Sequence, residues 1–165
     1  MMKRLGIAAA TFLALGLAAG CGDDNGNPGG PSNLTVFTVQ LLPSLENPPI
    51  TNAENTARGT AVITVNSQAN TIDFSVSLNS FPTTSTLTAA HIHPGATGVN
   101  GGVLIGTGLT SGNAPSLSSG SATFTFNGVG ATADQVAQIL ANPQNFYFNV
   151  HSSTNPTGVM RGQLR

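Results

Sequence analysis

The three histidines of this chain fall in two short segments, and their type and spacing make them the best candidates for chemistry. His91 and His93 lie in the segment Ala-Ala-His-Ile-His-Pro-Gly-Ala at 89–96, and His151 follows Phe-Asn-Val at 148–150. Neutral imidazole is the commonest metal ligand of its kind, and three imidazoles with an open fourth position suit Zn²⁺ or Cu²⁺. The pattern therefore indicates a candidate metal site, provided that the fold brings the two segments together.

The spacing of the histidines places them on two predicted strands. Residues two apart in a β-strand point to the same face, so a strand over 87–93 presents His91 and His93 side by side. His151 ends a second predicted strand over 146–151, and the spacing leaves open whether the two strands share a sheet. In the alternative interpretation, the three rings hydrogen-bond loop backbone at 95–102 and 152–158, which needs no metal.

The rest of the chain reads as short alternating segments joined by turns, which is typical of an all-β domain. The clearest is 71–79, where Phe74 belongs to an apolar face and Asp73 to the polar face. Such segments predict an antiparallel β-sandwich or flattened barrel with Greek-key-like connections. The predicted strands cover 34–42, 57–65, 71–79, 87–93, 103–109, 120–127, 146–151 and 159–164.

One helix interrupts the strands. Thr132 and Gln135 form a capping-box pattern, followed by an apolar stripe at helical spacing that includes Val136 and Ile139. We expect a short helix at about 132–141, ended by Asn142 and the proline that follows it, and packed as a lid on the strands.

The composition excludes some classes of protein. Charged residues make up only 7% of the chain, and outside the N-terminal segment the cations are Arg58, Arg161 and Arg165. So few basic side chains cannot form the surface that binds phosphate backbones, and we expect no nucleic-acid partner. The sequence also contains no phosphate loop, Ser-His-Asp pattern or paired-acid signature.

The N-terminus has the features of an export signal. Lys3 and Arg4 precede an apolar segment at 5–17, which is too short to span a bilayer comfortably. The residues Leu-Ala-Ala-Gly-Cys at 17–21 resemble the lipobox of bacterial lipoproteins, in which the cysteine is lipidated. The alternatives are a plain secretory signal and an uncleaved anchor. We therefore expect a lipoprotein signal peptide over 1–20 and lipidation at Cys21.

Cys21 is the only cysteine, so its lipidation leaves no thiol for disulfides, zinc thiolate sites or nucleophilic catalysis. The segment 21–33 is rich in turn-forming residues and predicts a flexible tether to a single domain over 34–165. The lipid anchor implies the cell envelope as the location and the membrane as a partner. Gly22, rather than an aspartate, follows the cysteine, which favours the outer membrane of a Gram-negative cell, facing the periplasm or the cell surface.

Two motifs carry a family resemblance. The segments AAHIHPGATGVNGGV at 89–103 and FYFNVHSSTNPTGVMRGQL at 146–164 resemble the histidine motifs of the chordin domain (CHRD) family. Glu46 with the prolines that follow it, and the segment 57–61, resemble the earlier family signals, so the resemblance covers 34–164. Val159 and Met160 depart from the family pattern, which has an acidic and an aliphatic residue there.

The resemblance implies a β-rich extracytoplasmic module, found in bacterial proteins and in an animal regulator of growth-factor signalling, with no agreed activity. It marks Asn149, Arg161, Gly162 and Gln163 as motif residues. It also makes Glu46 the only motif carboxylate that could join the histidines. Arg161 could bind an anion, but structural pairing with Glu46 or Asp73 is the favoured interpretation.

These observations favour a non-catalytic binding or structural lipoprotein whose protein or glycan partner the sequence leaves open. The alternative is a metal-binding domain that holds Cu or Zn on His91, His93 and His151, with a redox-related role. The strand with two histidines also resembles the copper-binding strand of copper/zinc superoxide dismutases. Dismutation needs more ligands than three histidines supply, so we expect no such catalysis.

Overall fold

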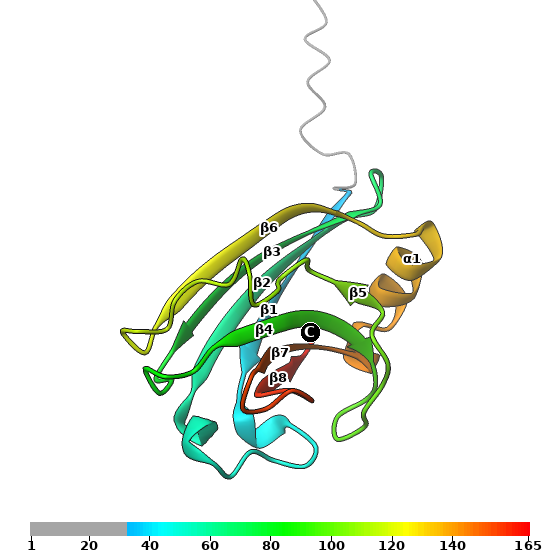
Figure 1. Ribbon diagram of the computed structural model, residues 1–165. Coiled ribbons are helices and arrows are strands. Elements are labelled where there is room, and N and C mark those ends of the chain that lie inside the picture. The colour runs from blue at the N-terminus through cyan, green and yellow to red at the C-terminus, as the bar shows by residue number, and fades with distance from the viewer. Residues whose placement is uncertain (1–32) are drawn as a thin grey trace, which may run out of the picture. The chain divides into compact units, whose positions relative to one another are not determined.

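A computed structural model describes residues 33–165, which form two antiparallel β-sheets of four strands each (Figure 1). The strand order is β1-β2-β3-β6 in the first sheet and β5-β4-β7-β8 in the second. The predicted all-β sandwich is therefore confirmed. The strands are β1 Leu34–Leu41, β2 Arg58–Asn66, β3 Thr71–Asn79, β4 Leu87–Pro94, β5 Ile105–Gly106, β6 Ala122–Gly130, β7 Phe146–Ser152 and β8 Met160–Gln163.

Some predictions concern residues that are not described. The predicted signal peptide at 1–20, the predicted lipidation site Cys21 and all but the last residue of the predicted tether at 21–33 lie outside the described residues. Within 33–165, no helix is long and apolar enough to cross a membrane.

The two sheets form a sandwich that is joined at one edge and does not close into a barrel. Leu42, just after β1, pairs with Arg161 in an isolated antiparallel bridge, so the end of β1 meets β8 of the other sheet. Between β3 and β4, between β5 and β6, and again between β6 and β7, the chain passes from one sheet to the other. The β6–β7 passage carries the helix.

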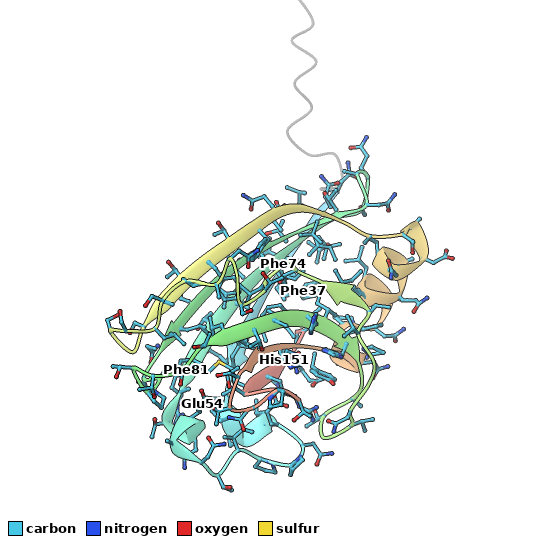
Figure 2. The ribbon with its side chains drawn as sticks, viewed as in Figure 1. Phe37, Glu54, Phe74, Phe81 and His151 are labelled. Atoms are coloured by element: carbon cyan, nitrogen blue, oxygen red, sulfur yellow. The ribbon has the colours of Figure 1, made fainter. Side chains whose placement is uncertain are left out.

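The core lies between the sheets, where the apolar faces of the alternating strands meet. In β3, every second residue from Ile72 to Leu78 is buried, whereas Asp73 and its same-face neighbours are exposed. Phe74 stacks on Phe148 of the opposite sheet, with ring centroids 5.6 Å apart. Figure 2 shows Phe37 and Phe74 between the two layers of strands. Burial of this apolar surface is the main force that stabilises the sandwich.

The predicted strand over 103–109 is wrong in length, because only Ile105–Gly106 (β5) is a strand. These two residues pair with Ile92 and His91 of β4. Gly108 has φ +93°, outside the range of regular strands, and no regular pairing continues past Gly106. β5 nevertheless flanks His91.

The predicted helix is confirmed as α1 Ala133–Ala141. The hydroxyl of Thr132 accepts a hydrogen bond from the backbone nitrogen of Gln135, and the Gln135 side chain accepts one from the backbone nitrogen of Thr132. Val136 and Ile139 are buried against the sandwich, as a lid requires.

Loops cover the outer face of the second sheet, and this cover distinguishes it from the first sheet. Every residue of β7, on both faces, is buried. The short 3₁₀ helices η1 Pro43–Leu45 and η2 Ala53–Thr56 belong to this cover. The loops at 95–104 and 153–158 complete it, because side chains of the outer face hydrogen-bond their backbone. The histidines point into this covered layer.

Candidate functional site

The structure brings all three histidines together on the outer face of the second sheet. His91 and His93 lie on β4, and His151 lies on β7, the strand that pairs with β4. Nδ1 of His91 lies 3.0 Å from Nε2 of His151. One ring nitrogen of each histidine can be chosen so that all three lie within 4.8 Å of one another. His151 therefore shares a sheet face with the pair, and the three imidazoles form a cluster that could hold a metal ion.

The other nitrogens of two rings are fixed by backbone carbonyls of the covering loops. Nδ1 of His93 lies 3.0 Å from the carbonyl oxygen of Gly101, and Nδ1 of His151 lies 3.0 Å from that of Pro156. Because a carbonyl only accepts, both Nδ1 atoms carry the proton and donate. The predicted hydrogen bonds to loop backbone thus exist, and they coexist with the convergence of the rings. Metal-binding histidines are held in this same way, with the second nitrogen donating to a carbonyl.

These donations decide which lone pairs are available. Nε2 of His93 and Nε2 of His151 are unprotonated, and the first is buried without a hydrogen-bond partner. In the metal-free site, Nδ1 of His91 donates to Nε2 of His151. If the proton of His91 moves to its own Nε2, each of the three rings offers one lone pair within the cluster, without any change in charge.

The environments of His91 and His151 favour the neutral form that metal binding needs. Burial, reinforced by the neighbouring His151 and His93, lowers the pKa of His91 to about 4. Burial also lowers the pKa of His151, against the opposing effect of its bond to Pro156, and His93 lowers it further. At neutral pH, both imidazoles are therefore ready ligands, because protons compete with a metal only in more acidic solution.

Tyr147, the only tyrosine of the chain, packs beside the cluster and was not foreseen from the sequence. Its ring stacks on His93 with an interplanar angle of 5° and a centroid separation of 5.0 Å. Its hydroxyl accepts a hydrogen bond from the backbone nitrogen of Gly101 at 3.2 Å. The guanidinium carbon of Arg161 lies 4.5 Å from the centre of the same ring. Tyr147 thus fixes the plane of His93 and the loop that holds it.

Arg161 is buried and structural, but not as the sequence interpretation proposed. Its Nε donates to the carbonyl of Leu45 at 2.6 Å, and Nη1 donates to the carbonyl of Val99 and to Oδ1 of Asn100. Asp73, the second carboxylate proposed for it, instead accepts from the backbone of Gly128. Arg161 therefore ties β8 to the loops over the histidines.

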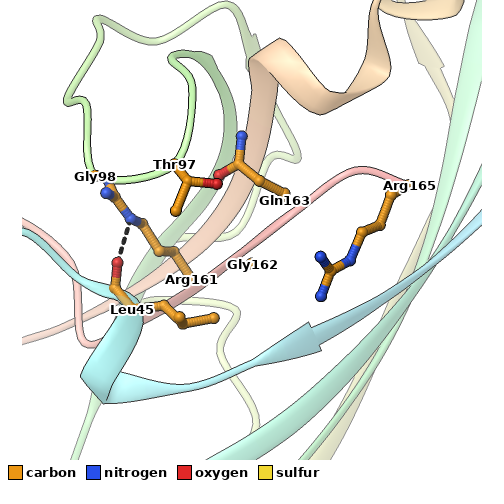
Figure 3. Close-up of a pocket in the computed structure, with 7 residues that line it drawn as sticks. All are labelled: Leu45, Thr97, Gly98, Arg161, Gly162, Gln163 and Arg165. Carbon is orange, nitrogen blue, oxygen red and sulfur yellow. Dashed lines mark hydrogen bonds between the residues drawn. The ribbon is translucent and has the colours of Figure 1, made fainter.

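A pocket beside Arg161 contains the closing family motif (Figure 3). Gly162 lies where β8 passes β1, and a β-carbon there would overlap the carbonyl of Gln40. Nε2 of Gln163 donates to the carbonyl oxygens of Gly95, Gln144 and Phe146. Gly162 and Gln163 therefore have structural roles, the first in close packing and the second in hydrogen bonding to loops. The pocket is lined by Leu45, Thr97, Gly98, Arg161, Gly162, Gln163 and Arg165, and by none of the histidines.

Glu46 is buried near Arg161 and Asn149, and it is not a member of the three-histidine group. Burial raises its pKa to about 7, and the charge of Arg161 opposes that rise. Its Oε1 is buried without a hydrogen-bond partner, and so are Oδ1 of Asn149 and Nη2 of Arg161. Glu46 is thus a neighbour of the site and not one of its converging ligands.

Glu54 is a further buried carboxylate, and the sequence interpretation missed it. It accepts hydrogen bonds from the hydroxyls of Ser85 and Ser152, each at 2.6 Å, and from the side-chain amide of Asn155. Figure 2 shows Glu54 beside the loops of the second sheet. Ser152 and Asn155 belong to the turn whose Pro156 carbonyl holds His151, so Glu54 supports the site. The only feature of the sequence that could have pointed to Glu54 is that the chain has just six acidic residues.

One of three comparisons with known proteins found a match, and it agrees with the motifs. No curated protein and no solved structure matches the chain. The model of the CHRD domain family matches residues 37–164, which include all the strands of both sheets except the first residues of β1. The chain therefore belongs to the CHRD domain family.

Proposed function

We propose that this domain is a non-catalytic metal-binding module that holds one divalent ion, Cu²⁺ or Zn²⁺, on His91, His93 and His151. The observation that carries the proposal is the convergence of three imidazoles, two of which are oriented by hydrogen bonds from their Nδ1 atoms to backbone carbonyls. Nε2 of His93 is buried without a partner in the metal-free protein, which costs free energy unless an ion occupies the site. Imidazole nitrogen suits both metals.

Metal titration of the purified, metal-free protein tests this function. Adding Zn²⁺ or Cu²⁺ should raise the melting temperature, and an ion at a hundredfold excess over its Kd should stabilise the fold by about 2.7 kcal/mol. His93→Ala should abolish that response and leave the metal-free protein folded. Asp134→Asn, which removes an exposed carboxylate on α1, should respond like the wild type. An unchanged wild-type melting temperature with either metal contradicts the proposal.

We also propose that the module is exported and anchored at the cell envelope by a lipid on Cys21. The charged N-terminus, the short apolar segment and the lipobox-like residues at 17–21 support this address. Cys21→Ser should move the protein from the membrane fraction to the soluble periplasm or the medium. A folded variant that still pellets with membranes would show that the anchor is not this lipid.

A further inference from the structure

The most unusual groups outside the three histidines are buried polar atoms without partners, and one of them lies within the histidine face. Oδ1 of Asn149 makes no hydrogen bond, although the residue is only 2% exposed. A buried oxygen left without a donor destabilises a fold, so such atoms are rare and call for an explanation. Asn149 is therefore a group that something other than the folded protein should satisfy.

The strand register places Asn149 in the middle of the site. It lies directly opposite His91 across the β4–β7 pair, and it shares its face of β7 with His151, two residues further along. Directly opposite side chains have β-carbons about 4.5–5.5 Å apart. His91 contributes Nδ1, the ring nitrogen nearer its backbone, so an ion bound there sits close enough to the sheet for a short side chain to reach.

The position of Nδ2 shows how the side-chain amide of Asn149 is placed. A β-carbon placed on Gly158, whose φ is +137°, would lie 2.8 Å from Nδ2 of Asn149 and 2.6 Å from Oε1 of Glu46. The amide nitrogen therefore faces the β7–β8 turn and the carboxyl of Glu46. The oxygen is the other branch of the same amide, and the strand register places His91 of β4 on one side of Asn149 and Arg161 of β8 on the other. The absence of a side chain at Gly158 leaves space for this arrangement.

Building on the proposed function, we infer that Oδ1 of Asn149 is the fourth ligand of the ion held by His91, His93 and His151. The resulting set of three nitrogens and one oxygen closes a four-coordinate sphere. Closed spheres are typical of structural metal sites, whereas catalytic sites keep a position open for water or substrate. Burial of Asn149, His93 and His151 agrees with an ion that is shielded from solvent. The ion then stabilises the loops over the second sheet and does not turn over a substrate.

Two substitutions at Asn149 in the full-length protein, with Zn²⁺ and Cu²⁺ as the probes, test the fourth ligand. Asn149→Leu keeps a similar volume but removes the oxygen, and it should weaken metal affinity about 10- to 100-fold in competition with a chelator. Its metal-free melting temperature should stay level or rise, because an unsatisfied polar atom is gone. Asn149→Asp adds a charged oxygen and should tighten binding. In the Cu²⁺ form it should shift the electron paramagnetic resonance spectrum, as a change of ligand requires.

A matched control separates ligation from packing. The hydroxyl of Thr107 is buried with both its hydrogen bonds made, to the Ala90 carbonyl and from the Leu109 nitrogen. Thr107→Val should therefore lower the metal-free melting temperature and leave metal affinity unchanged. If Asn149→Leu binds metal with wild-type affinity, Asn149 is not a ligand, although the three-histidine site is still supported. A lower metal-free melting temperature in Asn149→Leu, with affinity unchanged, assigns Asn149 a packing role. Failure of the wild type to bind either metal would refute the proposed function itself.

Discussion

The two sheets of this sandwich use the same strand pairing but treat their outer faces differently. In β3 of the first sheet, buried and exposed residues alternate, and Asp73 and the serines face solvent. In β7 of the second sheet all seven residues are buried, including Asn149 and His151. An exposed polar face needs no further structure, because water satisfies it. A buried polar face must be satisfied by loops or by a ligand, and that requirement is what turns the second sheet into a candidate site.

The difference extends to the charged residues. The second sheet contains Arg161, and the β1–β2 connection that covers it contains Glu46 and Glu54, each less than a tenth exposed. Glu54 is satisfied by neutral donors, and Arg161 mostly by carbonyls. Glu46 keeps one oxygen without a partner. Buried charge is costly, so its concentration on one side of the molecule agrees with a functional site on that side.

The largest expected effect is at the contact that both sheets share. Phe74→Ala removes the ring that stacks on Phe148 and leaves a cavity between the sheets, so it should cost about 3–5 kcal/mol in the free energy of unfolding. Denaturant unfolding measures this loss. A cost below about 1 kcal/mol would mean that Phe74 does not join the two sheets as described.

Glu54→Gln tests whether the second sheet depends on its buried carboxylate. In the wild type, two hydroxyls and one amide donate to the two oxygens of Glu54. A glutamine side chain has only one oxygen, so its NH₂ group would face at least one of these donors. We expect a loss of about 2–4 kcal/mol, measured by thermal or denaturant unfolding. A neutral result would show that the turn holding His151 does not rely on Glu54.

The pH dependence of stability distinguishes the buried carboxyl from the histidines. The folded protein holds the proton of Glu46 up to a pKa of about 7, whereas the unfolded chain releases it near 4.5. Glu46 therefore lowers stability progressively as pH rises from about 4.5 to 7. Glu46→Gln should remove this loss and gain up to about 3 kcal/mol at pH 8, with little change at pH 4.

The histidines act in the opposite direction. His91 stays neutral in the fold down to a pKa of about 4, while the unfolded chain takes up its proton near 6.5. His91 thus reduces stability as pH falls from 6.5 toward 4, and His151 acts with the same sign. Unfolding curves of wild type and Glu46→Gln across this range measure both effects. A Glu46→Gln gain that is equal at pH 4 and pH 8 would contradict the raised pKa.

The smallest effect is expected on the exposed face of the first sheet. Asp73→Asn keeps the oxygen that accepts from the backbone nitrogen of Gly128 and should change stability by about 0.5 kcal/mol or less. The same unfolding assay serves as the check. A larger loss would mean that the charge of Asp73 stabilises the first sheet, and the two sheets would then differ less than described.

Much of the fold was predictable because its signals are local. The alternation at 71–79 predicted β3 to the residue, and Thr132 with Gln135 predicted the start of α1. Period-two burial and a capping box depend only on neighbours in the chain. The failed prediction of a full strand at 103–109 has the opposite cause. Val103 is exposed and Leu109 is buried outside the strand, so the apolar pattern of this segment reflects more than one environment and, of its apolar residues, only Ile105 joins the ladder.

By itself, the sequence determined that His91 and His93 share one face, because a strand repeats every two residues. It did not determine that His151 joins them, because that depends on β7 pairing with β4 across a separation of 60 residues. The carbonyl partners of the rings, the stacking of Tyr147 and the position of Asn149 opposite His91 depend on the same pairing and on the covering loops. Long-range strand pairing and loop cover are decided by the packing of the whole domain, and only the tertiary structure contains them.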